Sequence, residues 1–350
     1  MAVQIRKDTA AVWSSVNPTL AVGEWGMETD TGKIKIGDGT YAWNSLEYVA
    51  TTGSLYTFQG STSGYTSGGQ LGSNVVDKYP FASDGNATDV GDLTVGRYAV
   101  AGQSSSTNGY TTGGVVAPTN SASDVIDKFP FSSNANATDV GNLTAARWRV
   151  AGQSSSTNGY TSGGDPYAST SPANIIDKFP YASDGNATDV GDTSVALWGR
   201  VGQSSADNGY SSGGRNPPVG TVNVIDKFPF SVDGNATDVG DLTVGRYRSS
   251  GQSSADNGYT SGGLNPPQSP TSTNVIDKFS FSSNANATDV GDLTALNYDT
   301  AGQSSTASGY STGVAGGGNV IEKFPFSADA NATDVGDLST PSNRSAGQQV

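Results

Sequence analysis

The chain has 350 residues, of which 47 are glycine, only 14% are charged, and none is cysteine or histidine. Disulfides, cysteine metal sites and histidine acid–base catalysis are therefore excluded. The net charge of -14 disfavours binding to nucleic acid and to anionic membranes. No apolar run approaches membrane-helix length, and no hydrophobic secretory segment accompanies Arg6 and Lys7. We therefore expect a protein made in a cytoplasm that leaves the cell by an unconventional route, such as lysis by a virus.

Residues 1–52 form the first predicted domain, because they lack the repeats that fill the rest of the chain. Asp8 and Thr9 can cap a short helix that runs through Trp13 and ends before Asn17-Pro18. Short strands with tight turns are expected to follow. A domain this small without cysteine has a poor surface-to-volume ratio, so we expect it to gain stability from partners.

Short motifs run through this domain in a characteristic order. They are Gln4-Ile5-Arg6, Trp13, Pro18-Thr19-Leu20, Gly23-Glu24, Glu28 to Lys33, Lys35 to Gly39 and Trp43-Asn44-Ser45-Leu46. In these residues the segment resembles the N-terminal domain of phage major tropism determinants and related tail-fibre and virion proteins. The resemblance implies an intertwined, β-prism-like homotrimer that attaches to other virion subunits. The alternative is a monomeric domain packed against the rest of the chain.

Residues 54–350 contain six copies of one sequence unit, and together they form the second predicted domain. Gly-Tyr pairs place tyrosines at 65, 110, 160, 210, 259 and 310, which gives spacings of 45 to 51 residues. A period near 50 with turn-rich, strand-sized segments is typical of a propeller blade of four strands. In the second unit the expected strands are 150–153, 109–112, 125–129 and 137–140. The sequence thus predicts an all-β protein with a six-bladed β-propeller.

The two ends of the repeat array are offset from each other. A Gly-Gln pair begins at 102, 152, 202, 251, 302 and 347, so Gly-Tyr starts the array and Gly-Gln ends it. We therefore expect residues 344–348 to complete the blade that begins at Gly64-Tyr65, which closes the ring and removes two sheet edges. Residues 56–59 are the alternative for this closing strand.

Three features recur in the units: an arginine before the inner strand (Arg97, Arg147, Arg246 and Arg344), a Gly-Gly pair, and a following Val-Ile-Asp strand. In these features the units resemble kelch repeats. Leu197 and Asn297 depart from the arginine position, and the tryptophan spacing of the kelch family is missing.

Differences among the copies separate a predicted scaffold from predicted contact surfaces. The Asp-Val-Gly element is constant, and we interpret it as a turn. Variation is concentrated in the loops 115–123, 165–173, 215–222, 264–273 and 314–318 and at the start of each inner strand. Both regions should lie on one face, around the central channel, where loops on a rigid scaffold often carry function. The alternative is neutral drift of solvent loops. The candidate receptor-binding residues are Tyr167, Arg215, Asn216, Asn265, Arg149, Arg200 and Arg248.

Metal binding and catalysis have weaker support in the sequence. Asp84 to Asp92 carries oxygen ligands at a spacing that calcium could use, but turn capping explains them without a metal. The six Asn-Ala-Thr sequons are interpreted as turn residues. Paired carboxylates could hydrolyse glycosides, yet the aspartates recur with the scaffold, and Glu322 is interpreted as a neutral variant. We expect no enzyme, no metal site and no cofactor.

These observations together predict a phage virion protein of the fibre or tip type. The variable face of the propeller is expected to bind a host surface glycan or protein, and arginines there could pair with anionic sugars. The alternative is a capsid or tail decoration protein without a receptor-binding role. Either protein would be assembled in the host bacterial cytoplasm and would end in the virion.

Overall fold

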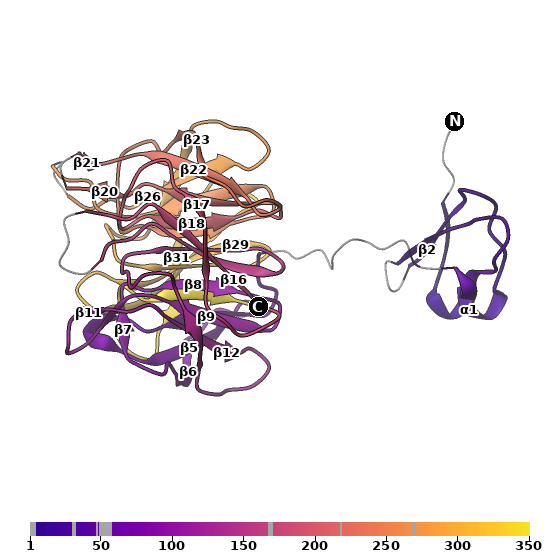
Figure 1. Cartoon of the computed structure of the whole chain (residues 1–350), viewed down its shortest axis with the longest axis horizontal. Helices are drawn as coiled ribbons and strands as arrows, with labels where there is room; N and C mark the ends of the chain where they lie inside the picture. Colours follow the sequence, from indigo (N-terminus) through magenta and orange to yellow (C-terminus); the bar gives the residue numbers. More distant parts are fainter. Residues whose placement is uncertain are drawn as a thin grey trace. The chain divides into compact units, whose positions relative to one another are not determined.

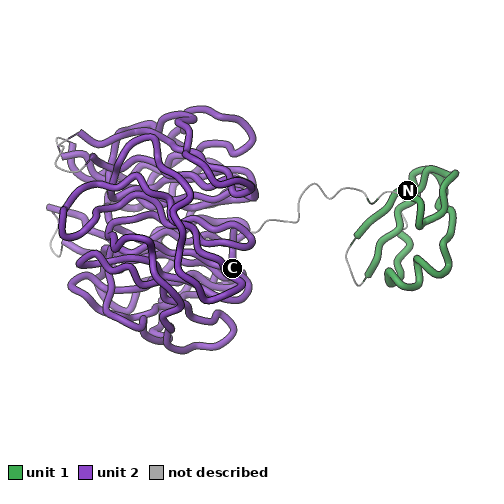
Figure 2. The backbone as a smooth tube through the Cα atoms, turned by 60° about the horizontal axis from the view of Figure 1, so that its bottom comes forward, with its two compact units in different colours: residues 1–56 green, residues 57–350 purple. Residues whose placement is uncertain are grey.

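A computed structural model describes residues 5–29, 33–46, 48, 58–166, 171–217, 219–267 and 271–350. The chain divides into two compact units, unit 1 over residues 1–56 and unit 2 over residues 57–350 (Figure 2). Each unit is described by itself.

Unit 1 is a small sheet with one helix. The strands β1 (Arg6–Asp8), β2 (Trp25–Glu28) and β3 (Ile34–Ile36) lie in the order β1-β2-β3, with β1 parallel to β2 and β2 antiparallel to β3. The helix α1 (Ala10–Val16) begins where Thr9 accepts a hydrogen bond from the backbone N–H of Val12. It ends at Asn17, which adopts the left-handed conformation.

The core of unit 1 is aromatic. Trp13 from α1 stacks on Trp43 from the 3-10 helix η1 (Trp43–Ser45), with ring centroids 4.1 Å apart, and Leu20 and Leu46 complete the cluster. The predicted turn at residues 30–32 lies outside the described residues. The turn at 37–39 is present, and backbone N–H groups of Tyr41 and Thr40 donate to Asp38 and lower the pKa of its carboxyl group.

Unit 2 consists of six four-stranded antiparallel sheets, the blades of the predicted propeller (Figure 1). Blade 1 contains β32 (Ala346–Gln349), β4 (Ser63–Ser67), β5 (Val75–Pro80) and β6 (Thr88–Asp92). Blade 2 contains β8 (Ala101–Ser104), β9 (Asn108–Thr112), β12 (Val125–Pro130) and β13 (Thr138–Asn142). Blade 3 contains β14 (Ala151–Ser154), β15 (Asn158–Ser162), β16 (Ile175–Pro180) and β17 (Thr188–Asp192).

The other three blades repeat this order. Blade 4 contains β18 (Val201–Ser204), β19 (Asn208–Ser212), β22 (Val224–Pro229) and β23 (Thr237–Asp241). Blade 5 contains β24 (Ser250–Ser253), β25 (Asn257–Ser261), β26 (Val275–Ser280) and β27 (Thr288–Asp292). Blade 6 contains β28 (Ala301–Ser304), β29 (Ser308–Val314), β30 (Gly318–Pro325) and β31 (Thr333–Asp337).

Short elements connect the blades. They are the strands β7 (Arg97–Tyr98), β10 (Val115–Val116), β11 (Ser121–Ala122), β20 (Arg215–Asn216) and β21 (Gly220–Thr221), and the 3-10 helix η2 (Gln70–Gly72). The expected strand 150–153 of the second unit was placed wrongly, because the inner strand of blade 2 is β8 and β14 belongs to blade 3.

Blade 1 is built from both ends of unit 2. Strand β32 pairs with β4, so that Gln348 lies opposite Tyr65 and Gly347 opposite Thr66. The backbone of Val350 also exchanges hydrogen bonds with Ser63. Of the alternative segment 56–59, residues 56 and 57 lie outside the described residues. Gln59 donates to the carbonyl of Ser253 at the end of β24 and does not take the place of the closing strand.

The inner strands approach each other too closely for side chains at one position. A Cβ added to Gly152 would collide with the carbonyl oxygen of Gly102 in the preceding blade, and the same holds around the ring for Gly102, Gly202, Gly251, Gly302 and Gly347. The glutamine that follows each of these glycines then reaches the next blade. Gln103 donates to the carbonyl oxygen of Tyr160 at 3.0 Å, and the other five make the same bond. The Gly-Gln pair therefore joins neighbouring blades.

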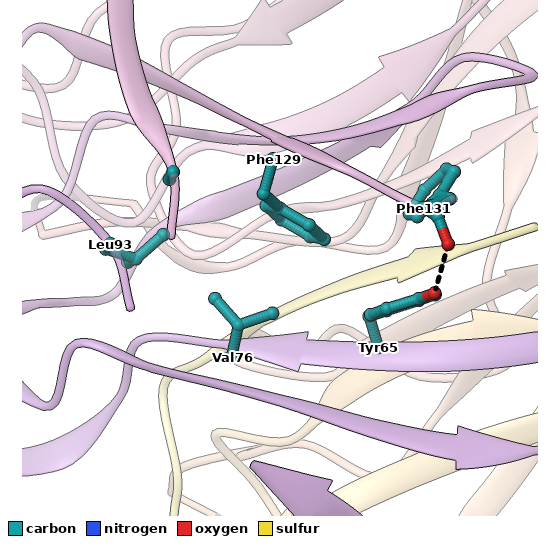
Figure 3. Close-up of a cluster of buried hydrophobic side chains, with 6 residues drawn as sticks. Tyr65, Val76, Leu93, Phe129 and Phe131 are labelled. Carbon is teal, nitrogen blue, oxygen red and sulfur yellow. Dashed lines mark hydrogen bonds between the residues drawn. The ribbon is translucent and has the colours of Figure 1, made fainter. Parts of the chain in front are cut away.

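Apolar side chains fill the space between blades farther from the channel. In the cluster drawn in Figure 3, Tyr65 and Val76 of blade 1 pack against Phe129 and Phe131 of blade 2, and Leu93 covers one end. Tyr65 and Phe131 have ring centroids 4.8 Å apart. Equivalent clusters recur at the other blade junctions, so the repeat is also the unit of core packing.

The Asp-Val-Gly element was predicted to be a turn, and this prediction is wrong. The element is part of the outermost strand of each blade. The backbone N–H of Asp92 at the end of β6 donates to the side chain of Asn136 in blade 2 at 3.1 Å. The asparagines of the other sequons accept the same bond from the preceding blade. These asparagines therefore tie blades together.

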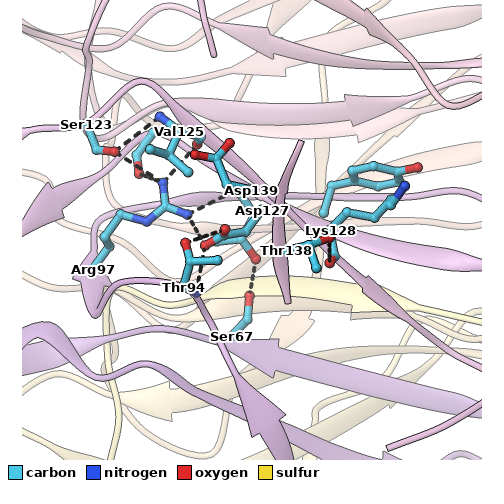
Figure 4. A network of polar contacts seen from close by, with 12 residues as sticks. Ser67, Thr94, Arg97, Ser123, Val125, Asp127, Lys128, Thr138 and Asp139 are labelled. Carbon is cyan, nitrogen blue, oxygen red and sulfur yellow. Dashed lines mark hydrogen bonds and ion pairs between the residues drawn. The ribbon is translucent and has the colours of Figure 1, made fainter. Parts of the chain in front are cut away.

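Several blades contain a buried ion pair between an arginine that precedes the inner strand and an aspartate of the third strand (Figure 4). The guanidinium of Arg97 donates to the carboxylate of Asp127 at 2.7 Å, and Thr94 donates its hydroxyl to the same carboxylate. Arg147 with Asp177 and Arg246 with Asp277 repeat the pair, and all these side chains are fully buried. In blade 6 the longer Glu322 takes the acidic position and accepts from Thr294, while Asn297 holds the arginine position and donates to the carbonyl of Gly313.

Arg200 corrects one prediction. It was expected at the edge of the channel, but its side chain is fully buried and its guanidinium lies 2.7 Å from the carboxylate of Asp226. Leu197 occupies the usual arginine position of this blade, so Arg200 supplies the missing guanidinium from three residues further along the chain. Arg200 is therefore a scaffold residue.

We predict that alanine at Gly152 destabilises the propeller. The new Cβ would overlap a backbone carbonyl of blade 2, so Gly152→Ala should lower the free energy of unfolding by about 1–3 kcal/mol. Urea denaturation measures the effect. Gly185→Ala is the matched control, because a Cβ there meets nothing within 4 Å. Equal stability of the two variants would contradict the close approach of the inner strands.

The ion pair of Arg200 with Asp226 in blade 4 can be reproduced in blade 3 by two substitutions. Arg147→Leu leaves the carboxylate of Asp177 buried without its guanidinium, which should cost about 3–5 kcal/mol of unfolding free energy. Adding Val150→Arg reproduces the blade 4 arrangement and should recover a large part of that loss in the same denaturation experiment. A double variant no more stable than Arg147→Leu would show that Arg200 does not replace the usual arginine.

Candidate functional site

The variable loops and the starts of the inner strands lie at one end of the channel. Strand β8 runs antiparallel to β9, with Ala101 opposite Thr112, so the start of each inner strand lies beside the loop that leaves the second strand. Figure 1 shows β7, β11, β20 and β21 together on this side of unit 2, which we call the variable face. The backbone N–H of Gly60, near the start of unit 2, donates to the carbonyl of Ser304. Ser304 lies at the end of β28 away from the variable face, so the chain enters unit 2 on the opposite face.

Six residues form a closed hydrogen-bonded ring at the channel end on the variable face. The backbone N–H of each donates to the carbonyl of its neighbour at 2.6–2.9 Å, and every member has a positive φ, between 55° and 67°. We call this set the mouth ring; its members are Ala99, Arg149, Gly199, Arg248, Asp299 and Arg344. Left-handed backbone is unfavourable for residues other than glycine, and the closed set of bonds stabilises it here.

The mouth ring carries three arginines and one aspartate. Asp299 accepts from Arg344 Nε at 2.9 Å and from Arg248 Nη1 at 3.4 Å. The guanidinium of Arg149 has no hydrogen-bond acceptor among the described residues. The guanidinium carbon lies 3.6 Å from the ring centroid of Trp148 and 4.2 Å from that of Trp198. Burial, followed by repulsion from Arg248, lowers the pKa of Arg149 to about 9, so the guanidinium remains protonated at pH 7.

A set of aromatic residues surrounds the mouth ring. Each precedes a ring residue in the chain, and the set, which we call the aromatic rim, is Tyr98, Trp148, Trp198, Tyr247 and Tyr298. Trp198 meets Tyr247 edge to face at 5.0 Å. The first residue of a variable loop pairs with the rim through the backbone, as Arg215 does with Trp198. Sequence changes in the loops therefore act directly on the rim.

The pocket at the mouth has a volume of about 120 Å³ and is lined by each blade's chain from the mouth ring to the Gly-Gln glycine. This space holds about four water molecules, and it is smaller than a typical small-molecule pocket of roughly 300–1,000 Å³. It can accept one small polar group, while the rest of a ligand would lie outside on the rim and loops.

The structure brings together part of the predicted contact set. Arg149 and Arg248 are in the mouth ring, and Arg215 donates to the hydroxyl of Tyr247 at 3.1 Å. Asn216 donates its side-chain amide to the carbonyl of Ala196, and the backbone of Asn265 donates to Thr271 within its own loop. Arg200 is excluded by its burial, and Tyr167 lies outside the described residues.

Sequence reasoning missed other members of the site. Arg344 was grouped with Arg97, but it precedes Gly347 by three residues, as Arg149 precedes Gly152, and it belongs to the mouth ring. Ser342 holds the position equivalent to Arg97. Counting back from each Gly-Gln pair would also have located Asp299 and the aromatic rim.

The described residues offer no grouped set of carboxylates for a metal ion. In the Asp84 to Asp92 segment, Asp84 pairs with Lys323, and Asp89 accepts the backbone N–H of Gly91 at 3.1 Å. These aspartates are engaged within the propeller.

We predict that Arg149 contributes little to stability. Loss of its stacking on two tryptophans, about 0.5–2 kcal/mol per contact, is offset by relief of repulsion and of charge burial. Arg149→Ala, which copies Ala99 in the same ring, should therefore change the free energy of unfolding by less than about 1 kcal/mol. Urea denaturation followed by tryptophan fluorescence tests this; a loss as large as that of Arg147→Leu would place Arg149 in the scaffold.

Comparison with known proteins agrees with both units. Residues 3–41 match the family model of the major tropism determinant N-terminal domain. No curated protein matches the chain in sequence. A solved structure described as "Structure of YjhT", a kelch-like β-propeller protein, has a TM-score of 0.58 and 12% identity, over 71% of this chain and 86% of that chain. At this identity the likeness concerns the fold alone. The chain thus joins a segment of the phage tropism-determinant type to a propeller of kelch-like fold.

Proposed function

We propose that the protein is a fibre or tip protein of a phage virion, and that the variable face of its propeller binds a receptor on the host surface. The N-terminal match to a tropism-determinant domain supports a phage tail-fibre type of protein. The observation that carries the receptor-binding role is the mouth, where a guanidinium without an acceptor, an aromatic rim and the variable loops meet.

Unit 1 would trimerise the protein and hold it on other virion subunits. Several of its large apolar side chains are exposed, among them Val16, Val22 and Tyr41 at 64%, 81% and 58%. Exposed apolar groups concentrated in so small a unit favour burial against further copies. None of the helices in the described part of the chain is long and apolar enough to cross a membrane.

We favour binding over catalysis for the mouth. A glycosidase needs one carboxyl group that can donate a proton and a second carboxylate. The carboxylate of Asp299 accepts hydrogen bonds from two guanidinium groups, and it is the one carboxylate among the six residues of the mouth ring. Its role is better explained as orienting Arg248 and Arg344.

Exchange of a variable loop tests receptor binding. Blades 1 and 6 have the shortest connections, and that of blade 6 is 314–318, between Gly313 and Asn319. Replacing residues 214–222 of blade 4 by Val-Ala-Gly-Gly-Gly copies that connection and removes Arg215 and Asn216. We expect the full-length protein to adsorb to host cells and this variant to lose most of its adsorption, with circular dichroism confirming the fold.

The alternative role has a distinct outcome. If neither protein adsorbs to cells but both still assemble onto phage particles, the propeller is a decoration or structural module, and the loops differ by drift. An exchange variant that adsorbs as well as the original would remove the blade 4 loop from the receptor site.

A further inference from the structure

We propose that the channel mouth binds a carboxylate group carried by a saccharide, with Arg149 as its main partner. This inference rests on the proposed function, because it names the chemistry of the receptor that the variable face would recognise. The carboxylate enters the pocket, and the sugar that carries it lies outside against the aromatic rim and loops.

The hydrogen-bonding state of Arg149 is the first argument. A guanidinium has five N–H donors in a fixed plane, and none of those of Arg149 meets an acceptor among the described residues. The scaffold arginines Arg97 and Arg147 donate to aspartates instead. The donors of Arg149 are available to a ligand, and a carboxylate accepts two of them in a bidentate geometry.

The position of Arg149 beside two aromatic rings is the second argument. Trp148 and Trp198 both contact the guanidinium, and these contacts restrict its conformations before a ligand binds. Neither contact uses an N–H donor in a hydrogen bond with a protein acceptor, so the donors stay available to a ligand.

Charge and size favour a small anionic group. Three arginines of the mouth ring, Arg149, Arg248 and Arg344, together with Arg215 of the adjoining loop outnumber Asp299 in the ring and Asp165 beside it. The mouth therefore carries a net positive charge that an anion balances. The volume of about 120 Å³ fits a carboxylate and excludes the bulk of a sugar.

The surroundings favour a saccharide as the carrier. Tyrosine and tryptophan present an apolar ring together with a polar group, which suits ligands with both kinds of surface. The aromatic rim meets the variable loops at the mouth. The rest of the protein is acidic, with a net charge of -14, so polyanions without a fitting group should be repelled.

Binding of the full-length protein to immobilised polygalacturonate tests the inference. We expect saturable binding that weakens with added salt, and no binding to the fully methyl-esterified polymer, which lacks the charge. Arg149→Ala should weaken binding about tenfold or more, as expected for loss of a charge-assisted hydrogen-bonded pair. Lys78→Gln is the matched control, because it removes one positive charge from the third strand of blade 1 and should leave binding unchanged.

Several results would overturn the proposal. They are absence of binding to polygalacturonate, equal binding to the methyl ester or to dextran sulfate, and equal binding of Arg149→Ala and the original protein. Adsorption to host cells is measured alongside. If adsorption still depends on the blade 4 loop while polygalacturonate fails to bind, the carboxylate inference is wrong and the receptor-binding role stands. If adsorption is absent as well, the proposed function itself fails.

Discussion

The close approach of the six inner strands is the steric constraint on which the propeller depends. The carbonyl of one glycine lies where the next blade would place a Cβ, so only glycine fits at this level of the channel. At this separation the following glutamine reaches the tyrosine carbonyl of its neighbour. Three residues before these glycines, toward the variable face, the blades are again close together. Six backbone N–H groups there donate to six carbonyls, and these bonds close the mouth ring.

The constraint also separates residues that hold the fold from residues that are free to act. Arg147 and Arg149 are two positions apart, yet one is paired with Asp177 in the interior and the other stacks at the mouth without an acceptor. Backbone bonds, not side chains, form the mouth ring. Alanine, glycine, aspartate and arginine therefore all occur at equivalent positions, and the charge of the mouth can change without loss of the ring.

The repeats made the propeller predictable from the sequence. Whether an individual residue could also be placed depended on its position in the blade. Six Gly-Tyr and six Gly-Gln pairs indicated six blades and the pairing of residues 344–348 with the first unit, and the kelch-like fold is confirmed. Arg344 was misplaced because it was matched by residue type and not by its distance from Gly347. Arg200 could not be placed from sequence, since its partner Asp226 is recognised only once the blade is folded. The sequon asparagines were interpreted as turn residues. Their bonds join different blades, and such bonds cannot be recognised from the sequence of a single repeat.

The pairing of β32 with β4 has a mechanical consequence. The chain enters unit 2 beside this junction, where Thr62 and Ser63 donate to the carbonyl of Val350 and the side chain of Gln349 donates to the carbonyl of Phe58. A pull along β4 would therefore load its hydrogen bonds to β32 and to β5 at the same time, in shear, and not one after another as in unzipping. The pairing that closes the ring is thus also the place where tension on the chain entering unit 2 would be resisted.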